Sequence, residues 1–254
     1  MVDLHVHILP GVDDGASGIE ESLQMARLAV AGGVHAMAVT PHCNIPGTFE
    51  NYEGPALRRR LEELKAAVRR EKIKLELFCG MEVFGRENLA ELLDRKLLVP
   101  INDGIYLLIE FPFEESANWM TFLLEEVLRA GYVPLVAHPE RYEAVKRDPQ
   151  TAWRWVRMGC ALQVNKGSIQ GRFGRGEQRT AMLLLEHELV ACVASDAHHA
   201  DFRTPYMRDV ADYLEEYFGG GCVQLLLEDN PARILDGREI VLLEPRGFSR
   251  NWFG

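Results

Sequence analysis

The sequence predicts an α/β protein folded as a distorted, TIM-like (β/α)7 barrel in a single domain. Seven short apolar runs alternate with longer amphipathic stretches over most of the 254 residues. The apolar runs are nearly continuous, which is typical of parallel strands that are covered by helices. No low-complexity segment or Pro/Gly-rich hinge divides the series. A doubly wound open sheet is the second interpretation, because it shows the same alternation.

Each predicted strand is followed by a segment of helical period. The strands are expected at 2–7, 34–40, 74–80, 105–110, 133–138, 160–165 and 190–195. Apolar residues recur every three or four positions in 19–31, 55–72, 87–95, 116–130, 149–158 and 175–187, which predicts helices there. Two or three more helices follow the last strand. We expect residues 1–236 to form the barrel and 237–254 to be an extended C-terminal tail of unknown role.

Charge and composition exclude several classes of protein. The formal net charge of −10 argues against a nucleic-acid partner, which needs a basic surface. No apolar run approaches the roughly 20 residues that span a bilayer, and the N-terminal segment lacks the pattern of a signal peptide. These features predict a cytoplasmic protein without membrane insertion. The five cysteines are scattered and form no C-x-x-C pair, so we expect no disulfide framework.

Imidazole and carboxylate side chains gather where the predicted strands end. Nine of them lie at the ends of six strands or in the loops just after: His5, His7, Asp14, His42, Glu82, Glu110, His138, Asp196 and His198. A single strand histidine is more often a core residue than a ligand, and a single carboxylate after a strand often caps a helix. The carboxyl ends of parallel barrel strands converge on one face, however. Nine such residues together therefore predict a metal site.

The residue types indicate which metals and which chemistry to expect. Five imidazoles and four carboxylates favour Mn, Fe, Zn or Mg. Nine ligands exceed the needs of one ion, which predicts two or three divalent ions with a bridging carboxylate. Such a cluster binds phosphate oxygens and lowers the pKa of a bound water to about 7. The sequence thus predicts a phosphoesterase that uses a metal-activated hydroxide.

Hydrolysis of a phosphate ester also calls for fixed cations beside the metals. Arg141 directly follows His138 and could hold phosphoryl oxygens through its fork of donors. Arg203 is the second candidate and Lys166 the third; the alternative role for each is a surface salt bridge. His198 could assist catalysis as well as bind metal. Of the other three histidines, His35 is expected at the face of the barrel opposite the site. His187 is expected in solvent, and His199 at the rim of the pocket.

The ordered set HVHILPGVDDG, TPH, GMEV, Glu110, AHPER and SDAH resembles the polymerase-and-histidinol-phosphatase (PHP) superfamily. The extended opening and HPER are similar to the capsule-type bacterial protein-tyrosine phosphatases. The resemblance covers the chain to about residue 236. It implies a (β/α)7 barrel with three divalent ions, most often manganese. It also implies hydrolysis of phosphotyrosine on a cognate bacterial tyrosine kinase that regulates capsular or extracellular polysaccharide synthesis.

The resemblance further implies a role for each residue of the set. The first ion's ligands would be His5, His7, Glu82 and Asp196; the second's Glu82, Glu110 and His138; the third's Asp14, His42 and His198. Arg141 and Arg203 would hold the phosphate. The loop 43–54 should flank the pocket, and loops of this kind vary, so it could alter the choice of substrate.

Other functions share part of this pattern. A small-molecule phosphatase of the histidinol-phosphatase kind would use the same nine ligands, and a metal-binding regulatory module could bind ions without turnover. An amidohydrolase usually carries a lysine on the fourth strand and a histidine on the sixth, where this chain has Glu110 and Asn165. A cysteine-dependent tyrosine phosphatase needs an arginine six positions after its cysteine. No cysteine here meets that condition.

Overall fold

The computed structural model describes residues 1–248, and all seven predicted strands are present in it. They are β1 (Val2–Val6), β2 (Ala36–Val39), β4 (Glu76–Cys79), β6 (Tyr106–Glu110), β7 (Val133–Ala137), β8 (Ala161–Asn165) and β9 (Cys192–Ala194). Every pairing between named strands is parallel. This confirms the predicted α/β class.

Two short strands were not predicted from the sequence. β3 (His42–Cys43) begins just after β2, and β5 (Glu82–Phe84) just after β4. Pro41 lies in the first interruption, where its missing N–H breaks the hydrogen-bond ladder. The strands consequently divide into two sheets, ordered β1-β2-β4 and β3-β5-β6-β7-β8-β9. Each interrupted pair acts as one bent strand of the barrel.

The two sheets meet again where the chain after β9 lies beside β1. The amide of Asp196 donates to the carbonyl of His5 at 2.9 Å, and the amide of His7 donates to the carbonyl of Ala197 at 2.8 Å. With these bonds the seven bent or straight strands close into a ring. The fold is therefore the predicted distorted barrel rather than an open sheet.

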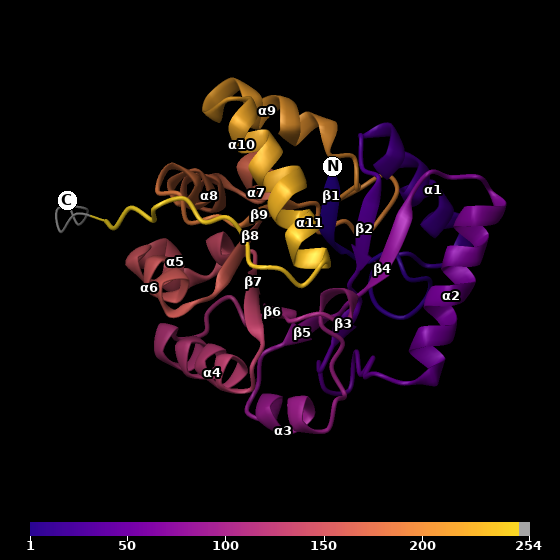
Figure 1. Ribbon diagram of the computed structural model, residues 1–254, viewed down its shortest axis with the longest axis horizontal. Coiled ribbons are helices and arrows are strands. Elements are labelled where there is room, and N and C mark those ends of the chain that lie inside the picture. Colours follow the sequence, from indigo (N-terminus) through magenta and orange to yellow (C-terminus); the bar gives the residue numbers. More distant parts are fainter. Residues whose placement is uncertain (249–254) are drawn as a thin grey trace.

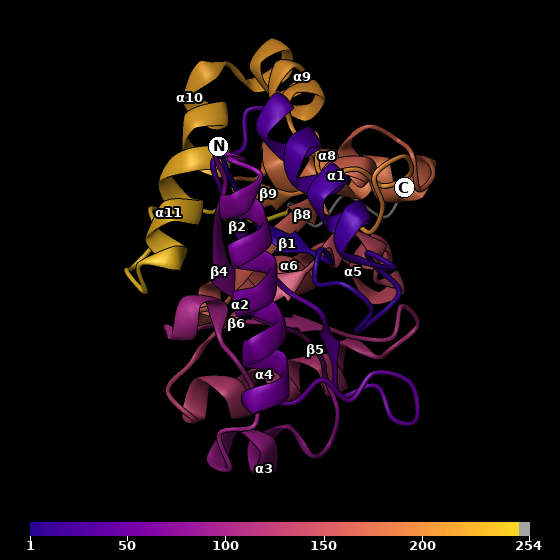
Figure 2. The same cartoon turned by 90° about the vertical axis from the view of Figure 1, so that its right-hand side faces the viewer.

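Helices surround the ring of strands (Figure 1). The six predicted ones are α1 (Ile19–Ala31), α2 (Pro55–Arg70), α3 (Leu89–Asp94), α4 (Ala117–Arg129), α6 (Gln150–Met158) and α8 (Arg175–Glu186). Figure 2 shows α1 and α2 in front of the three-stranded sheet. After β9 come α9 (Arg208–Phe218), α10 (Gly220–Gln224), a π-helical turn over Leu225–Asp229 and α11 (Asn230–Leu235). Two short helices, α5 (Glu143–Arg147) and α7 (Lys166–Ile169), were not predicted from the sequence.

Two apolar clusters stabilise this arrangement. The larger packs the helices against the outside of the barrel, and the smaller fills the barrel interior. The interior cluster includes Val2, Leu4 and Leu135, and Ile234 and Leu235 of α11 pack into it. α11 thereby closes the barrel at the amino ends of its strands. The polar side chains are left to gather at the carboxyl ends.

The described part of the tail, residues 237–248, is extended, mostly exposed and attached to the barrel at a few points. The Val241 amide donates to Asn230 Oδ1 at 2.8 Å, and the Phe248 ring stacks on His187 with ring centres 3.9 Å apart. His187 was expected to be solvated; that is wrong, because the tail half-buries it. The remainder of the predicted tail, 249–254, lies outside the described residues. Within residues 1–248, no helix has the length and apolar character needed to span a membrane.

Candidate metal centre

The structure brings all nine predicted ligands together at the carboxyl ends of the strands. Their donor atoms form four overlapping groups, and within each group the atoms lie no more than 4.8 Å apart. The groups are His7, Asp14, His42 and His198; His5, His7 and Asp196; His5, Glu82 and His138; and His42, Glu82 and Glu110. Six strand ends contribute, as the convergence of parallel strands predicts.

Three of the predicted site residues have an unusual backbone. His138, Asp196 and Arg203 have φ values of 35°, 49° and 49°, in the left-handed region. This conformation costs a residue with a Cβ roughly 1–2 kcal/mol. His138 and Asp196 come immediately or almost immediately after a strand, where the reversed backbone turns their side chains toward the barrel axis. Strain of this kind is characteristic of functional sites.

Glu82 lies at the middle of the cluster and is 1% exposed. Its Oε2 is 3.1 Å from His5 Nε2, 3.2 Å from His7 Nε2 and 3.0 Å from His42 Nδ1. Its Oε1 is 3.0 Å from His138 Nε2. One carboxylate thus faces four imidazoles, which is the placement required of a bridging ligand.

The unpaired atoms in the cluster fit a cation. Glu82 Oε2, His42 Nδ1 and Glu110 Oε1 are buried and make no hydrogen bond, although His42 Nδ1 is only 2.9 Å from Glu110 Oε1. A buried polar atom without a partner costs about 1–3 kcal/mol. Divalent ions bound among these donors would satisfy all three. The mixture of imidazole nitrogens and carboxylate oxygens suits Mn, Fe or Zn.

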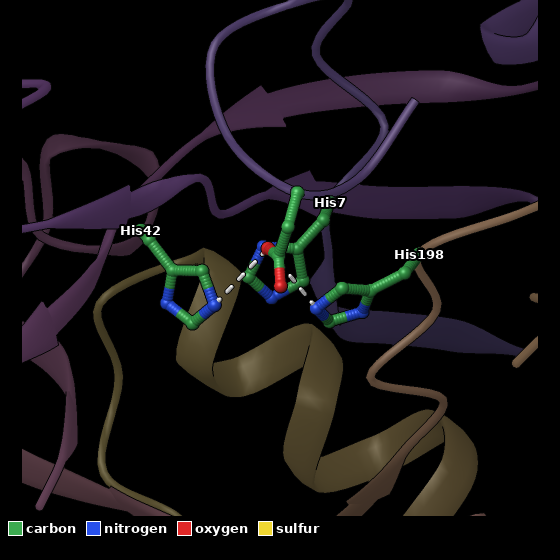
Figure 3. Close-up of side chains that lie close together, drawn as sticks. His7, His42 and His198 are labelled. Carbon is green, nitrogen blue, oxygen red and sulfur yellow. Dashed lines mark ion pairs between the residues drawn. The ribbon is translucent and has the colours of Figure 1, made fainter. Parts of the chain in front are cut away.

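The group nearest to solvent is built around Asp14, whose side chain is 55% exposed. Asp14 Oδ1 lies 3.4 Å from His42 Nε2 and 3.5 Å from His198 Nε2, and Figure 3 marks these ion pairs with dashed lines. The His7 ring centre is 3.9 Å from that of His198 and 4.4 Å from that of His42. Three imidazoles and one carboxylate therefore converge at the mouth of the site.

The electrostatics of the cluster favour positive charge. Burial lowers the pKa of His5, but the carboxylates of Glu82 and Asp196 outweigh burial and raise it to about 9. In the same way, Glu82 and Glu110 raise the pKa of His42 to about 12 against the effect of burial. Burial and the neighbouring His7 lower the pKa of His198 to about 2. His198 is consequently neutral at pH 7, the form in which an imidazole binds metal.

Sequence reasoning missed the residues that orient the ligands. His7 Nδ1 lies 2.8 Å from Asp13 Oδ2, and His5 Nδ1 lies 2.9 Å from Gln163 Oε1. Asn165 Nδ2 donates to Asp196 Oδ2 at 2.6 Å. Such partners fix the ring orientation and leave the opposite nitrogen free for a metal. The signals were the first aspartate of GVDDG and the period-2 pair Gln163 and Asn165 on β8.

The two predicted arginines both reach the edge of the centre. Arg203 Nη2 is 2.5 Å and Arg141 Nη1 is 3.8 Å from Asp196 Oδ2. Lys166, the third candidate, is buried, and its Nζ donates to the Tyr206 carbonyl at 2.5 Å. It also lies 3.7 Å from Asp209, so its ammonium is engaged in holding the loop before α9. Lys166 is therefore not available as a phosphate clamp.

The remaining histidines lie elsewhere, as expected. His35 pairs with Glu228 at 2.9 Å, and His199 pairs with Glu21 at 3.1 Å on the surface beside α1. Neither belongs to any of the four ligand groups.

Comparison with known proteins identifies the family. Residues 1–236 match the family described as capsular polysaccharide synthesis, CpsB/CapC. The chain belongs to the CpsB/CapC family. It is 34% identical to the tyrosine-protein phosphatase YwqE of Bacillus subtilis over 245 residues, which is 96% of this chain and 95% of YwqE. It is 31% identical over 240 residues to the tyrosine-protein phosphatase CpsB of Streptococcus pneumoniae, covering 92% of this chain and 98% of that one.

The fold of the CpsB/CapC family is the fold described above. A crystal structure from work on YwqE and the pneumococcal CpsB, described as unique metal-dependent tyrosine phosphatases, superposes with a TM-score of 0.91. The identity in that comparison is 33%, and 98% of this chain and 100% of the other are covered. The predicted family and the barrel are thus confirmed.

Proposed function

We propose that this CpsB/CapC protein hydrolyses phosphotyrosine in a protein substrate, using two or three divalent ions held by the nine clustered ligands. The chain is a metal-dependent tyrosine-protein phosphatase of the CpsB/YwqE type, linked to capsular polysaccharide synthesis. The observation that carries the proposal is the convergence of four imidazoles on the Glu82 carboxylate, beside two arginines that share Asp196.

The proposed ligand sets are those implied by the family resemblance. His5, His7, Glu82 and Asp196 would hold one ion; Glu82, Glu110 and His138 a second; Asp14, His42 and His198 a third. Close placement of Asp14, His42 and His198 supports the third set, and the central position of Glu82 supports its bridging role. We propose Mn²⁺, with Fe, Zn or Mg as alternatives. When bound, the ions would supply Lewis-acid chemistry that activates water near neutral pH and offsets phosphate charge.

The chain's own residues would bind and orient the phosphate. Arg141 and Arg203 each present a planar fork of N–H donors that matches two phosphoryl oxygens. Both guanidinium groups already pair with the Asp196 carboxylate, so an incoming phosphate would find them fixed at the edge of the centre. They would neutralise charge on the equatorial oxygens as the ester bond breaks. The leaving phenol has a pKa of about 10, which makes a strong general acid unnecessary.

We further propose that the protein substrate is a cognate bacterial tyrosine kinase, which regulates capsular or extracellular polysaccharide synthesis. The phosphatase would meet this kinase in the cytoplasm. The names of the relatives support a phosphotyrosine substrate, and the family description supports the link to capsular polysaccharide synthesis; the kinase is implied by the family resemblance. A small phosphate ester, as in histidinol phosphatases, and a metal-binding module without turnover are the competing outcomes. The nine-ligand set is common to all three.

One experiment separates these functions. Metal-loaded protein is assayed on a phosphotyrosine peptide and on histidinol phosphate, with Mn²⁺ and with a chelator. We expect faster turnover of the peptide, loss of activity with chelator, and loss of both activity and bound metal in His138→Ala. His35→Ala, outside the centre, is the matched control. Turnover of histidinol phosphate that is faster by orders of magnitude contradicts the substrate; absence of any turnover supports the module.

A further inference from the structure

Two aromatic rings lie against Arg141 at the edge of the metal centre. The guanidinium carbon of Arg141 lies 4.2 Å from the ring centre of Phe113 and 4.8 Å from that of Phe173. The guanidinium carbon of Arg203 lies 5.7 Å from the same Phe173 ring. Stacking of this kind holds a planar cation against a ring face. Phe173 therefore touches both of the arginines that point at Asp196.

The ring of Phe173 is seated on the backbone of α7. A Cβ at Gly167 would lie 2.7 Å from the Phe173 ring, so a side chain larger than hydrogen at that position would displace the ring. Phe173 is half-buried and lies close to Gly167 and to both guanidinium groups. It is placed to fix the arginines rather than to meet a ligand itself.

Phe113 is anchored differently. Its backbone carbonyl accepts a hydrogen bond from the amide of Glu143 at 2.8 Å, which ties the segment after β6 to the start of α5. Its ring lies edge-on to the His138 ring, with centres 6.1 Å apart, and its side chain remains 38% exposed. Phe113 thus offers apolar ring surface to solvent between a proposed metal ligand and a proposed phosphate clamp.

The location of that surface matters for the choice of ester. Because the ligands around Glu82 are buried and Phe113 at the rim is exposed, a phosphate held between the arginines and the metal centre would direct its ester oxygen toward the rim. In phosphotyrosine the first group beyond that oxygen is a phenyl ring, whereas in an alkyl phosphate such as phosphoserine it is a single methylene. A second aromatic ring beside the phosphate favours the phenyl group through face or edge contact.

We propose that Phe113 is a specificity residue that contacts the aromatic ring of the substrate, and that Phe173 is a positioning residue that acts through Arg141 and Arg203. Together they make the site selective for aryl over alkyl phosphates. The inference rests on the proposed phosphotyrosine activity and names the feature that gives it its substrate class.

The test compares two phosphonates that cannot be hydrolysed, phenylphosphonate and methylphosphonate, as inhibitors of the metal-loaded full chain. We expect Phe113→Leu to weaken inhibition by phenylphosphonate about five-fold more than inhibition by methylphosphonate, the worth of one aromatic contact. Any loss common to both inhibitors would report the contact between Phe113 and Arg141. Phe113→Tyr keeps the ring and should keep the preference. Phe173→Leu should weaken both inhibitors by a similar factor. Phe122→Leu, on α4 and stacked on Trp119, is the matched control and should change neither.

Two results have separate meanings. If wild-type protein turns over phosphotyrosine but Phe113→Leu weakens both phosphonates equally, or neither, the inference is overturned and the proposed function stands. If wild-type protein does not turn over phosphotyrosine, the proposed function fails, and the basis of the inference fails with it. Metal content of each variant, measured in parallel, shows whether a loss arises from an emptied centre instead of a changed rim.

Discussion

The two ends of the barrel are built on opposite principles. At the amino ends of the strands, Ile234 and Leu235 of α11 pack onto apolar residues such as Leu4. At the carboxyl ends, imidazoles and carboxylates are buried together, some of their atoms without hydrogen bonds. The same strands thus contribute to stability at one end and hold a costly polar cluster at the other. A substitution should accordingly have its larger effect on the activity at the polar end and on the free energy of unfolding at the apolar end.

The largest effect on activity is expected at the middle of the polar end. Glu82→Gln keeps the shape of the side chain but removes the charge that faces four imidazoles. Loss of an outer partner of a metal ligand already costs about 10–100-fold, so we expect activity with Mn²⁺ to fall by more than about 100-fold. The free energy of unfolding of the metal-free protein should fall as well, because the neutral amide would leave the buried imidazoles of His5 and His42, whose pKa values Glu82 raises, without their charged partner. Kinetic assays and urea unfolding measure the two quantities. A Glu82→Gln variant as active as wild type would contradict the assignment of the activity to the polar end of the barrel.

The opposite pattern is expected at the amino end. Ile234 is fully buried in the interior cluster. Truncation to alanine at such a position costs about 2–4 kcal/mol through lost burial and the cavity left behind. Urea unfolding of Ile234→Ala should show this loss, while kcat/KM at a temperature where the variant is folded stays within two-fold. A loss of specific activity beyond that range would show that the two ends are coupled.

A smaller effect is expected one step outside the ligands. Asp13 lies beside His7 Nδ1 and accepts a hydrogen bond from the amide of His42 at 3.0 Å. Asp13→Asn should weaken Mn²⁺ binding by about 10–100-fold, because the ring of His7 loses its charged partner. Activity should recover at high Mn²⁺. Asp201→Asn, at an exposed aspartate in the loop after β9, is the control; titration calorimetry gives both affinities. Equal affinities in the two variants would remove Asp13 from the centre.

The smallest effect is expected at Cys43, which is next to a proposed ligand yet belongs to the apolar wall. It is fully buried, and burial raises the pKa of its thiol to about 12, so almost no thiolate exists at neutral pH. Cys43→Ser should keep activity per folded molecule within about two-fold of wild type. An inactive but folded and metal-loaded variant would restore the thiol as a candidate nucleophile.

The general rule of parallel barrels was enough to predict the polar end. His5 and His7 share one face of a strand because strands have a period of two, and Glu110 and His138 were found because strand ends converge. The rule contains nothing about which groups pair across the barrel. Asp13, Gln163 and Asn165 were therefore missed, since their roles depend on strand register and on side-chain directions.

The amino end and the rim were harder to predict for a related reason. Phe113 and Phe173 are 60 positions apart along the chain and meet only through Arg141. α11 was expected as one of several late helices, but its sequence does not say that it enters the barrel. Contacts between distant segments are set by the closed fold as a whole. The split of the second and third strands into β2/β3 and β4/β5 was also missed, because Pro41 and Gly80 were read as ordinary strand ends.

Closure of the ring between β1 and the chain after β9 has a consequence for the order in which the protein folds. Asp196 lies 191 positions after His5 in the chain, and His198 lies 191 positions after His7. The polar end therefore cannot assemble until β9 and the loop after it have reached β1. Contacts of such long sequence separation slow folding. The complete set of proposed metal ligands consequently comes together only when the barrel closes, so tight binding of all the ions should follow closure rather than precede it.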